Sequence, residues 1–335
     1  MSGTRLALFS AKDCPQLALI RDILVEKGAD PLVCDMRLGG EGAPLVSIDG
    51  THASWGGHDF ADVAAIYVRC TAPNTLPSPP AVQNAASYCE YRADYLREQG
   101  FSAAAVSFFA ALGATGKLVI NELDTYADHD TKAQLYEKLR AQQFPVPETL
   151  TTNDPERAWG FMKSYPEVVV KPSVGVGSTR LFNEQDRDRL DQFGICPVMI
   201  QERIRGDTLR INIVGDSVVL SIRIVGSKEN VDSRTAPRGF EFVRLPGEEE
   251  ARIVRANRAL GLHYAAWDII ESHDGRYVYL DCNPGPYILW TGPEFSRAVL
   301  EQLGEYMIGY AETGSVAQAS ARVRPYVERR GGRAS

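Results

Sequence analysis

Apolar and polar positions in the first part of the chain predict alternating strands and helices. Residues 5–11 form a short apolar run typical of a buried strand, and apolar residues at helical spacing follow over 15–28. A second apolar run at 31–35 completes a strand–helix–strand unit, so a small α/β domain is expected at the start. Later elements expected from the same patterns are strands at 62–70 and 117–122 and a helix at 84–112.

The pattern changes after residue 130. A helix is expected from Thr131 to the proline-containing stretch FPVPET, and a second helix near 154–164 leads into an apolar strand at 167–171. From residue 197 onward, β-branched residues and short turns predict two hairpins, followed by a helix near 294–312. A chain of 335 residues is long enough for two or three packed domains.

The first hairpin, LRINIVGDSVVLSIRI, is expected to turn at residues 215–216. In that register one face is apolar, and the other carries Arg210, Asn212, Ser221 and Arg223. Two arginines without an acidic partner suit an anionic ligand, although a sheet that is simply half exposed to water has the same pattern. The expected cross-strand pairs are Val214 with Ser217, Asn212 with Val219, and Arg210 with Ser221.

The second hairpin, AAWDIIESHDGRYVYLDCN, is expected to have a two-residue turn at 274–275 that pairs Asp268 with Asp281. Two carboxylates that face each other across strands repel, so a positive group is expected between them. Asn283 shares their face, because residues two apart on a strand point the same way. Two carboxylates and an amide oxygen suit Mg²⁺. A different register, or an Arg or Lys that neutralises the pair, is the alternative.

Lysines and glycines mark a candidate phosphate site. Lys171 ends the expected strand EVVVK, and the loop after it contains Gly175, Gly177 and the hydroxyl of Ser178. Glycines let backbone N–H groups approach phosphate, and the lysine adds positive charge. Lys132 lies in the first turn of its expected helix, where an anionic ligand would relieve its conflict with the helix dipole. The alternatives are a plain turn after Lys171 and an exposed Lys132 neutralised by neighbouring aspartates.

The stretch PVMIQERIRGD predicts an apolar strand that ends in Gln201 and Glu202. Backbone groups at such a strand edge can bind a purine, and the carboxylate of Glu202 can accept a hydrogen bond from an amino group or a ribose hydroxyl. An exposed, charged strand end is the alternative meaning of the same residues.

Composition narrows the classes of function. The net charge of -7 argues against nonspecific nucleic-acid binding, and no apolar stretch is long enough to span a membrane. The first residues lack the layout of a signal peptide, and the six cysteines form no CxxC pair. A cytoplasmic protein without a zinc site or a disulfide framework is therefore expected.

The ordered set of motifs resembles the ATP-grasp superfamily, through the stretches TKAQLYEKLRAQQFPVPETLTTNDPE, VVVKP, IQERIRGDTLRINIVGDSVV, VDSRTAPRGFEFVRLP and WDIIESHDGRYVYLDCNPGP. The closer likeness is to RimK-type ligases and to the graspetide (microviridin-type) peptide ligases. The resemblance implies a mixed α/β fold, namely the α+β arrangement of ATP-grasp proteins. The implied parts are an N-terminal α/β (pre-ATP-grasp) domain at 1–116, a central ATP-grasp subdomain at 117–196, a C-terminal ATP-grasp subdomain with an antiparallel sheet at 197–315 and a basic tail at 316–335.

The resemblance also implies roles for individual residues. Glu202 and Ile204 would hold adenine, and Asp207 the ribose. Mg²⁺ would be held by Asp268, Asp281 and Asn283. Arg223 and Arg210 would lie beside an acyl phosphate, and Arg234 in a loop near the substrate. The full set implied for ATP is Lys132, Lys171, Gly175, Gly177, Ser178, Gln201, Glu202, Ile204 and Asp207.

Three features depart from the family pattern, the first being a glycine loop that is shorter than in many members. The second metal carboxylate is usually Glu, whereas Asp281 has a shorter arm, which weakens bidentate metal binding. The loop NPGPYILW replaces the small-residue turns that are common after the asparagine, so substrate contacts from this loop are left open.

The implied activity is that of an ATP-dependent carboxylate–amine ligase, which forms an amide (peptide-like) bond through an acyl phosphate and releases ADP and phosphate. A peptide is the expected substrate, and the alternatives are ligation of free amino acids or small metabolites, or phosphotransfer on the same fold. The implied cofactor is Mg²⁺, as two ions that Mn²⁺ can replace, with ATP as co-substrate. No nucleic acid or membrane partner is expected, and a homodimer is what the family suggests. The carboxylate, the amine and the general base are left open.

Overall fold

The computed structural model describes residues 4–11, 13–36, 46–50, 52–69, 85–173, 179–182, 196–226 and 237–326. The chain divides into two compact units. Unit 1 comprises Met1–Leu123 and Gly285–Arg324, and unit 2 comprises Asp124–Pro284 and Pro325–Ser335. A C-terminal segment therefore returns to complete the first unit. None of the described helices is both long enough and apolar enough to cross a membrane.

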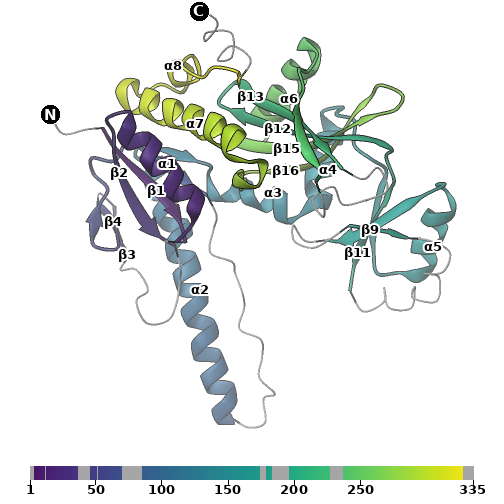
Figure 1. Ribbon diagram of the computed structural model, residues 1–335. Helices are drawn as coiled ribbons and strands as arrows, with labels where there is room; N and C mark the ends of the chain where they lie inside the picture. The colour runs from purple at the N-terminus through teal and green to yellow at the C-terminus, as the bar shows by residue number, and fades with distance from the viewer. Residues whose placement is uncertain are drawn as a thin grey trace, which may run out of the picture. The chain divides into compact units, whose positions relative to one another are not determined.

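Unit 1 combines a parallel sheet, a small antiparallel sheet and helices (Figure 1). Its elements are β1 (Arg5–Ser10), α1 (Pro15–Glu26), β2 (Asp30–Asp35), β3 (Val46–Asp49), β4 (His52–Trp55), β5 (His58–Asp59), β6 (Ala65–Val68), α2 (Ala85–Ala114), β7 (Leu118–Ile120), a 3-10 helix at Leu289–Thr291, α7 (Pro293–Thr313) and α8 (Val316–Ser320).

The parallel sheet of unit 1 has the order β2-β1-β6-β7. Helices α1 and α7 pack against each other, and both contact β1. An aromatic cluster fills the space between this sheet, the β3-β4-β5 sheet and α2, which accounts for much of the apolar burial in the unit. The cluster contains Phe9, Trp55, Phe60, Phe108 and Phe109.

Unit 2 contains two sheets with helices beside them. Its elements are a 3-10 helix at Leu123–Thr125, which begins at the unit boundary, α3 (Tyr126–Asp130), α4 (Lys132–Ala141), β8 (Thr149–Thr152), α5 (Pro155–Lys163), β9 (Val168–Pro172), β10 (Arg180–Phe182), β11 (Val198–Glu202), β12 (Gly206–Val214), β13 (Ser217–Val225), β14 (Gly239–Phe242), α6 (Gly247–Ala259), β15 (Tyr264–Ser272) and β16 (Tyr277–Asn283).

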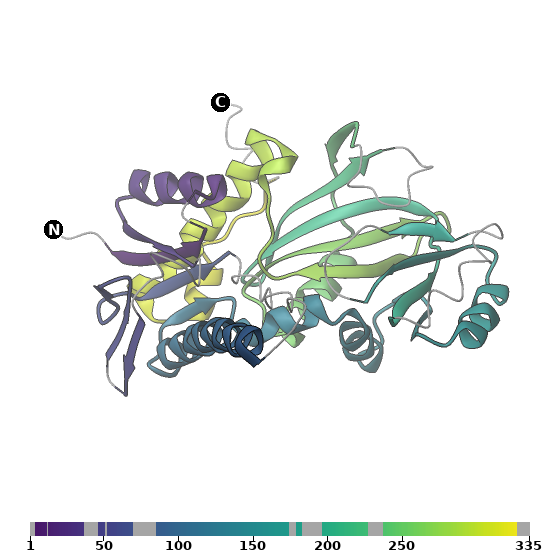
Figure 2. The ribbon, with the colours of Figure 1, turned by 90° about the horizontal axis from the view of Figure 1, so that it is seen from below.

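The larger sheet of unit 2 is antiparallel, with the order β14-β13-β12-β15-β16 (Figure 2). The smaller one has the order β10-β9-β11-β8. Leu209, Ile211 and Ile213 of β12 and Trp267 of β15 belong to a buried cluster with residues of α4 and α6. Because side chains alternate along a strand, the residues between them point to the opposite face. That opposite face, here called the site face, carries Arg210, Asp268 and Asp281.

A β-bulge changes the register of the first hairpin. Val214 faces Ser217 as predicted, but the pairing shifts by one residue between Asn212 and Ile213. A bulge places two residues of one strand opposite one residue of the other, and Val219 is the extra residue here. The predicted pairs beyond the bulge are therefore wrong. Arg210 faces Ile222 and Asn212 faces Leu220, where Ser221 and Val219 were expected.

The bulge also separates the two arginines of this hairpin. Arg223 pairs with Leu209, which belongs to the buried cluster, whereas Arg210 points to the site face. Ser221 pairs with Ile211 and leaves the face of Arg210 as well. The prediction of one polar face shared by these residues is wrong, because a one-residue shift moves every later side chain to the other face.

The second hairpin reaches the predicted central pair by a different route. Asp268 faces Asp281, as predicted. The turn, however, has three residues, because the N–H of Ser272 donates to the carbonyl of Arg276 and Gly275 takes a φ of 81°. A bulge at Leu280 then shifts the pairing by one residue and restores the predicted register. The predicted two-residue turn is wrong, and the pairing of the two carboxylates is confirmed.

The predicted α/β class is confirmed by these sheets and helices. The predicted early elements correspond to β1, α1, β2, β6, α2 and β7, and the later ones to α4, α5, β9, β11, the two hairpins and α7. The sequence pattern did not predict β3, β4, β5, β8, β10, β14, α3, α6 or α8, the last of which lies where a basic tail was expected.

Candidate active site

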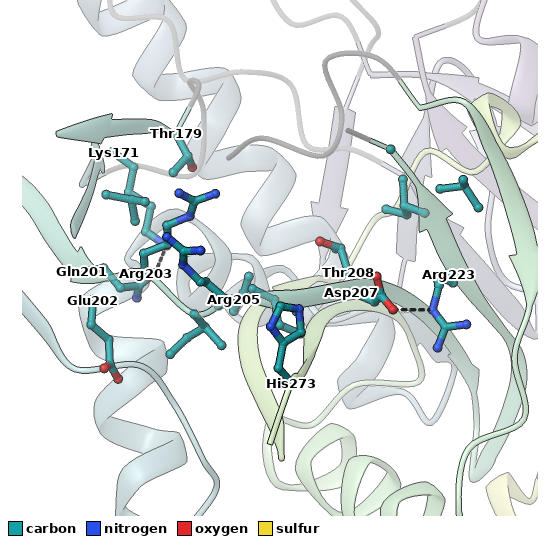
Figure 3. A pocket seen from close by; sticks show the side chains of 18 of the residues that line it. Lys171, Thr179, Gln201, Glu202, Arg203, Arg205, Asp207, Thr208, Arg223 and His273 are labelled. Atoms are coloured by element: carbon teal, nitrogen blue, oxygen red, sulfur yellow. Dashed lines mark hydrogen bonds and ion pairs between the residues drawn. The ribbon is translucent and has the colours of Figure 1, made fainter. Parts of the chain in front are cut away.

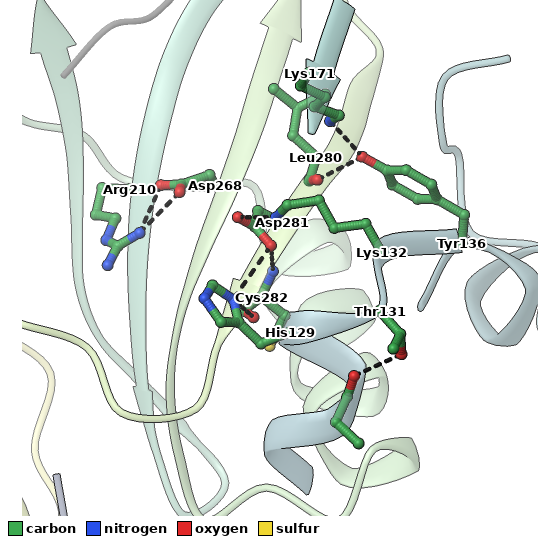
Figure 4. Close-up of polar contacts among 11 residues, drawn as sticks. His129, Thr131, Lys132, Tyr136, Lys171, Arg210, Asp268, Leu280, Asp281 and Cys282 are labelled. Carbon is green, nitrogen blue, oxygen red and sulfur yellow. Dashed lines mark hydrogen bonds and ion pairs between the residues drawn. The ribbon is translucent and has the colours of Figure 1, made fainter. Parts of the chain in front are cut away.

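Three charged side chains lie in one row across the site face. Arg210 on β12 pairs with Asp268 on β15, which in turn pairs with Asp281 on β16. Nη1 of Arg210 donates to both oxygens of Asp268, at 2.9 and 2.8 Å (Figure 4). Only 6% of Arg210 is exposed, so little water screens this ion pair.

Asp281 is held from the side by α3 and α4. β16 is the last strand in the order of its sheet, and α3 packs along it. Lys132, the first residue of α4, places Nζ 2.5 Å from Oδ2 of Asp281. His129 in α3 places Nδ1 3.6 Å from Oδ1 of Asp281 and 3.1 Å from the carbonyl oxygen of Cys282. The backbone N–H of Cys282 also donates to Oδ1, at 3.0 Å.

These cations change the acidity of Asp281. Burial alone would raise the pKa of the carboxyl group, but His129 and Lys132 outweigh burial and hold the pKa well below its usual range. Burial likewise lowers the pKa of His129, but Asp281 outweighs this and the pKa is raised overall. Asp281 is therefore ionised near neutral pH, as both an ion-pair partner and a metal ligand must be.

Asp268, Asp281 and Asn283 suit Mg²⁺ by the chemistry of their oxygens. Asn283 lies two residues after Asp281 on β16, so both point to the site face. No group of three His, Cys, Asp or Glu side chains comes together within the described ranges, so the candidate site rests on two carboxylates and an amide. The neutralising cations that were the alternative are present, as Arg210 and Lys132. The metal ligands remain a prediction.

Lys171 connects three elements at the end of β9. Its Nζ donates to the hydroxyl of Tyr136 on α4 and to Oε1 of Gln201 on β11, each at 3.0 Å. The hydroxyl of Tyr136 in turn donates to the carbonyl of Leu280 at 2.7 Å (Figure 4). Hydrogen bonds therefore lead from Lys171 to the residue that precedes Asp281.

A pocket of about 410 Å³ in unit 2 gathers many of the residues expected at the nucleotide (Figure 3). Its size lies within the range of about 300–1,000 Å³ typical of small-molecule sites. Leu280 lines it and adjoins Asp281 in sequence, so the pocket reaches the strand of the carboxylates. The lining residues that the resemblance implied are Lys171, Gln201, Glu202, Ile204, Asp207 and Arg223, whereas Lys132, Arg210, Asp268, Asp281 and Asn283 are not part of the lining.

Between β11 and β12, some of the described residues form hydrogen bonds with neighbouring segments of the chain and others do not. The Glu202 carboxylate accepts the N–H of Glu148 at 2.9 Å, and the Glu202 N–H donates to the Glu148 carbonyl at 3.0 Å. The N–H of Arg203 donates to the carbonyl of Glu167 at 3.0 Å. Among the described residues, none forms a hydrogen bond with the backbone of Ile204. The backbone of Ile204 is therefore better placed than the Glu202 side chain to bind a base.

Arg223 has acidic partners, contrary to the expectation from the hairpin. Its Nη2 lies 2.7 Å from Oε2 of Glu271. Its Nε lies 3.2 Å from Oδ2 of Asp207 (Figure 3). Arg210 has Asp268. The idea that both arginines lack an acidic partner is therefore wrong. Their implied roles beside an acyl phosphate remain predictions, as does that of Asp207 at the ribose.

Four of the predicted site residues lie outside the described residues. They are Gly175, Gly177 and Ser178 of the loop after Lys171, and Arg234.

Sequence reasoning missed several residues that the structure places at the site. His129 and Tyr136 make the contacts described above. His129 lies in α3 and Lys132 in α4, so no helical spacing in the sequence signalled that both reach Asp281. Other missed residues that line the pocket are Arg203, Arg205, Glu241 and His273.

Comparison with known proteins identifies the domain. Residues 129–238 match the family model described as ATP-grasp domain. The tetrahydromethanopterin:alpha-L-glutamate ligase of Methanocaldococcus jannaschii is 28% identical over 194 residues, 52% of this chain and 65% of the relative. A probable alpha-L-glutamate ligase of Shewanella sp. is 32% identical over 114 residues, 33% of this chain and 38% of the relative. The chain thus spans less than two thirds of the length of these relatives.

Solved structures resemble the chain over nearly its whole length. The ATP-grasp ligase PsnB, complexed with a phosphomimetic variant of its minimal precursor, Mg and ADP, matches with a TM-score of 0.78 and 25% identity over 95% of this chain and 99% of that one. The macrocyclase MdnC from Microcystis aeruginosa, bound with the precursor peptide MdnA, matches with a TM-score of 0.67 and 20% identity over 89% and 98%. The predicted resemblance is confirmed: the chain contains an ATP-grasp domain and has the fold of the ATP-grasp ligases.

Proposed function

We propose that the protein is an ATP-dependent ligase that joins a carboxylate to an amine through an acyl phosphate. The observation that carries this proposal is the direct pairing of Asp268 with Asp281 on a face where both are held by cations. Hydrogen bonds through Leu280 and Tyr136 join this pair to Lys171 and to a pocket of about 410 Å³. The named ligases among the relatives support the same chemistry.

The proposed binding roles follow from what each side chain can reach. Asp268, Asp281 and Asn283 would hold Mg²⁺, which when bound neutralises phosphate charge during phosphoryl transfer. Lys171 extends from the end of β9 and would bind phosphate oxygens, and Lys132 would do so after leaving Asp281. The adenine would lie against the backbone of Ile204. The remaining proposed ATP contacts are Gly175, Gly177, Ser178, Gln201, Glu202 and, at the ribose, Asp207.

The proposed reaction has two steps. A substrate carboxylate attacks the γ-phosphorus of ATP, which gives an acyl phosphate and ADP, and an amine then displaces phosphate to form the amide. Charge builds up on the transferring group, so fixed cations beside it lower the barrier. Arg210 lies beside Asp268 on the site face and would supply such a charge as Asp268 exchanges it for Mg²⁺. Arg223, and Arg234 in its loop, are the further arginines proposed for this role.

A peptide is the proposed carboxylate substrate. PsnB and MdnC, whose structures this chain resembles over most of its length, were each solved with a precursor peptide. A free amino acid is the second candidate, because several sequence relatives are named alpha-L-glutamate ligases. Phosphotransfer on the same fold remains the third alternative.

Finer features belong to the same proposal. Two Mg²⁺ ions are proposed, with Mn²⁺ able to replace them, together with a homodimer and a cytoplasmic location. The domain boundaries at residues 116, 196 and 315 are also proposed.

Product analysis tests this function directly. The protein is incubated with Mg·ATP and with amino acids, dipeptides or short peptides encoded near its gene, and ADP, phosphate and product masses are measured. A ligase gives ADP, free phosphate and a product lighter by one water than its summed reactants. A product heavier by one phosphate group without free phosphate would replace the ligase by a phosphotransferase.

A further inference from the structure

The two carboxylate oxygens of Asp281 have different kinds of partner (Figure 4). Oδ2 lies 2.5 Å from Nζ of Lys132. Oδ1 accepts the backbone N–H of Cys282 at 3.0 Å and lies 3.6 Å from Nδ1 of His129. One oxygen therefore contacts the end of a long, flexible side chain, and the other contacts a backbone group and a short ring.

The His129 ring has its own anchor on the same strand. Its Nδ1 lies 3.1 Å from the carbonyl oxygen of Cys282. A carbonyl oxygen only accepts hydrogen bonds, so Nδ1 must carry the hydrogen and donate it to this carbonyl, while Oδ1 of Asp281 lies within ion-pair distance of the same nitrogen. The ring is thereby tied to β16 at a position that does not depend on the nucleotide. Lys132 has no such second contact on β16 among those described.

The two contacts on Asp281 should respond differently when ATP binds. Lys132 carries a point charge on four methylene groups and can turn from Oδ2 to a phosphate oxygen. His129 and the Cys282 N–H stay in place, because their contacts lie within α3 and β16. Oδ2 is then the oxygen that becomes available, while Oδ1 remains held.

A short metal ligand needs this kind of support. The terminal torsion of an Asp side chain has a broad distribution, so an unsupported carboxylate samples many orientations. Partners that hydrogen-bond a ligating group typically contribute 10–100-fold to metal affinity or activity.

We propose that His129 is a positioning residue that fixes Oδ1 of Asp281, so that Oδ2 passes from Lys132 to the metal as a single coordinating oxygen. This inference rests on the proposed metal site. The simpler explanation is that His129 only helps α3 to pack on β16.

Mn²⁺ titration of the ADP-bound protein, followed by electron paramagnetic resonance, separates these explanations. His129→Asn keeps an N–H donor close to the position of Nδ1, whereas His129→Gln places its donor near that of Nε2. We expect the Kd for Mn²⁺ to rise by roughly 10–100-fold in His129→Gln and to stay within about threefold of wild type in His129→Asn. Metal-free ADP affinity should be unchanged in both.

The Mn²⁺ affinities of the two His129 variants can contradict the proposal. Equal Mn²⁺ affinity in wild type and His129→Gln, or equal losses in both variants, would overturn the positioning role.

Asp281→Asn serves as the control for the metal site itself and should lose the Mn²⁺ signal. If Asp281→Asn binds Mn²⁺ like wild type, the proposed metal site is wrong. If only Asp281→Asn loses Mn²⁺, the site stands and the role of His129 falls. Thermal unfolding of each variant verifies that it is folded.

Discussion

Asp268 and Asp281 face each other in a sheet, where two carboxylates would repel without a counter-ion. Arg210 supplies the counter-ion for Asp268, and Lys132 does so for Asp281. Compared with apolar side chains in the same place, partly buried ion pairs add little to stability, because the cost of removing charges from water offsets their attraction, although removing only one partner is costly. Two such pairs side by side are better explained by a binding role, in which the carboxylates exchange their protein cations for other positive partners.

Removing the charge of Asp281 tests the metal assignment at the level of turnover. Asp281→Asn keeps the shape of the side chain but leaves a neutral amide where an anion is needed to hold Mg²⁺. We expect Mg·ATP turnover to fall at least about 1,000-fold, because a whole ligand charge is lost from the site of phosphoryl transfer. ADP release is the measurement, and Asp274→Asn, at the exposed turn of the same hairpin, is the matched control. Near-normal turnover of Asp281→Asn would contradict the assignment.

Lys171 offers a separate test of the nucleotide pocket. Lys171→Ala removes the ammonium group that now bonds Tyr136 and Gln201 at the end of β9. We expect ATP affinity to fall by about 10–100-fold, which corresponds to one or two charge-assisted hydrogen bonds to phosphate. Isothermal titration calorimetry with a non-hydrolysable ATP analogue gives the affinity. Lys163→Ala, at the end of α5 and outside the pocket, should bind as tightly as wild type.

At the scale of elements, the sequence predicted the strands and hairpins that a regular alternation of apolar and polar residues indicates. Alternation and Gly-Asp or Asp-Gly turns located both hairpins. The predicted pair of Asp268 with Asp281 is present because a three-residue turn and the bulge at Leu280 offset each other. The bulges at Val219 and Leu280 were not predictable, because a bulge formed by ordinary apolar residues leaves no mark in the pattern. That omission put Arg223 on the wrong face. Six strands of two to four residues were missed because so few residues show no period, namely β3, β4, β5, β8, β10 and β14.

The contacts of Asp281 tie α3 and α4 to β16, and pH tests this tie. In the folded protein burial would raise the pKa of Asp281, but His129 and Lys132 lower it. Its contribution to stability is therefore complete above an unfolded pKa of about 3.9 and is lost as pH falls through the folded value. The contribution of His129 to stability has the opposite pH dependence. Its pKa is raised by Asp281 against burial, so its contribution is present below about pH 6.5 and lost as pH rises through the folded value.

The two effects together predict a maximum. We expect the difference in unfolding free energy between wild type and Asp281→Asn to be largest near about pH 5–6, at roughly 1.5–3 kcal/mol, and to shrink on both sides. Denaturant titrations of both proteins from acid to alkaline pH measure this difference. A difference that does not vary with pH would mean that these ion pairs do not form in solution.

At the scale of the whole molecule, the described part of the candidate site lies in unit 2, although the chain returns to unit 1 after it. The sequence showed the α/β start and the C-terminal helix but not that they share a unit, since the joining contacts are separated by more than 250 residues, as between Gln16 and Pro286. Side-chain partners such as His129 on Cys282 were hidden for the same reason. Periodicity reports local structure and says nothing about such distant pairs.

Thiol labelling tests whether nucleotide acts on unit 2 alone. Cys34 in unit 1 and Cys282 in unit 2 are buried, and burial raises the pKa of both thiols, that of Cys34 to about 12. In moderate urea at pH 8, each should react only when its surroundings open. Mg·ADP at about 100 times its Kd should slow labelling of Cys282 by roughly 100-fold and leave Cys34 unchanged. The exposed Cys89 and Cys196 should react at once as internal standards, detected by peptide mass spectrometry. Equal slowing of both buried thiols would show that the units open together, and no slowing at Cys282 would contradict a nucleotide site in unit 2.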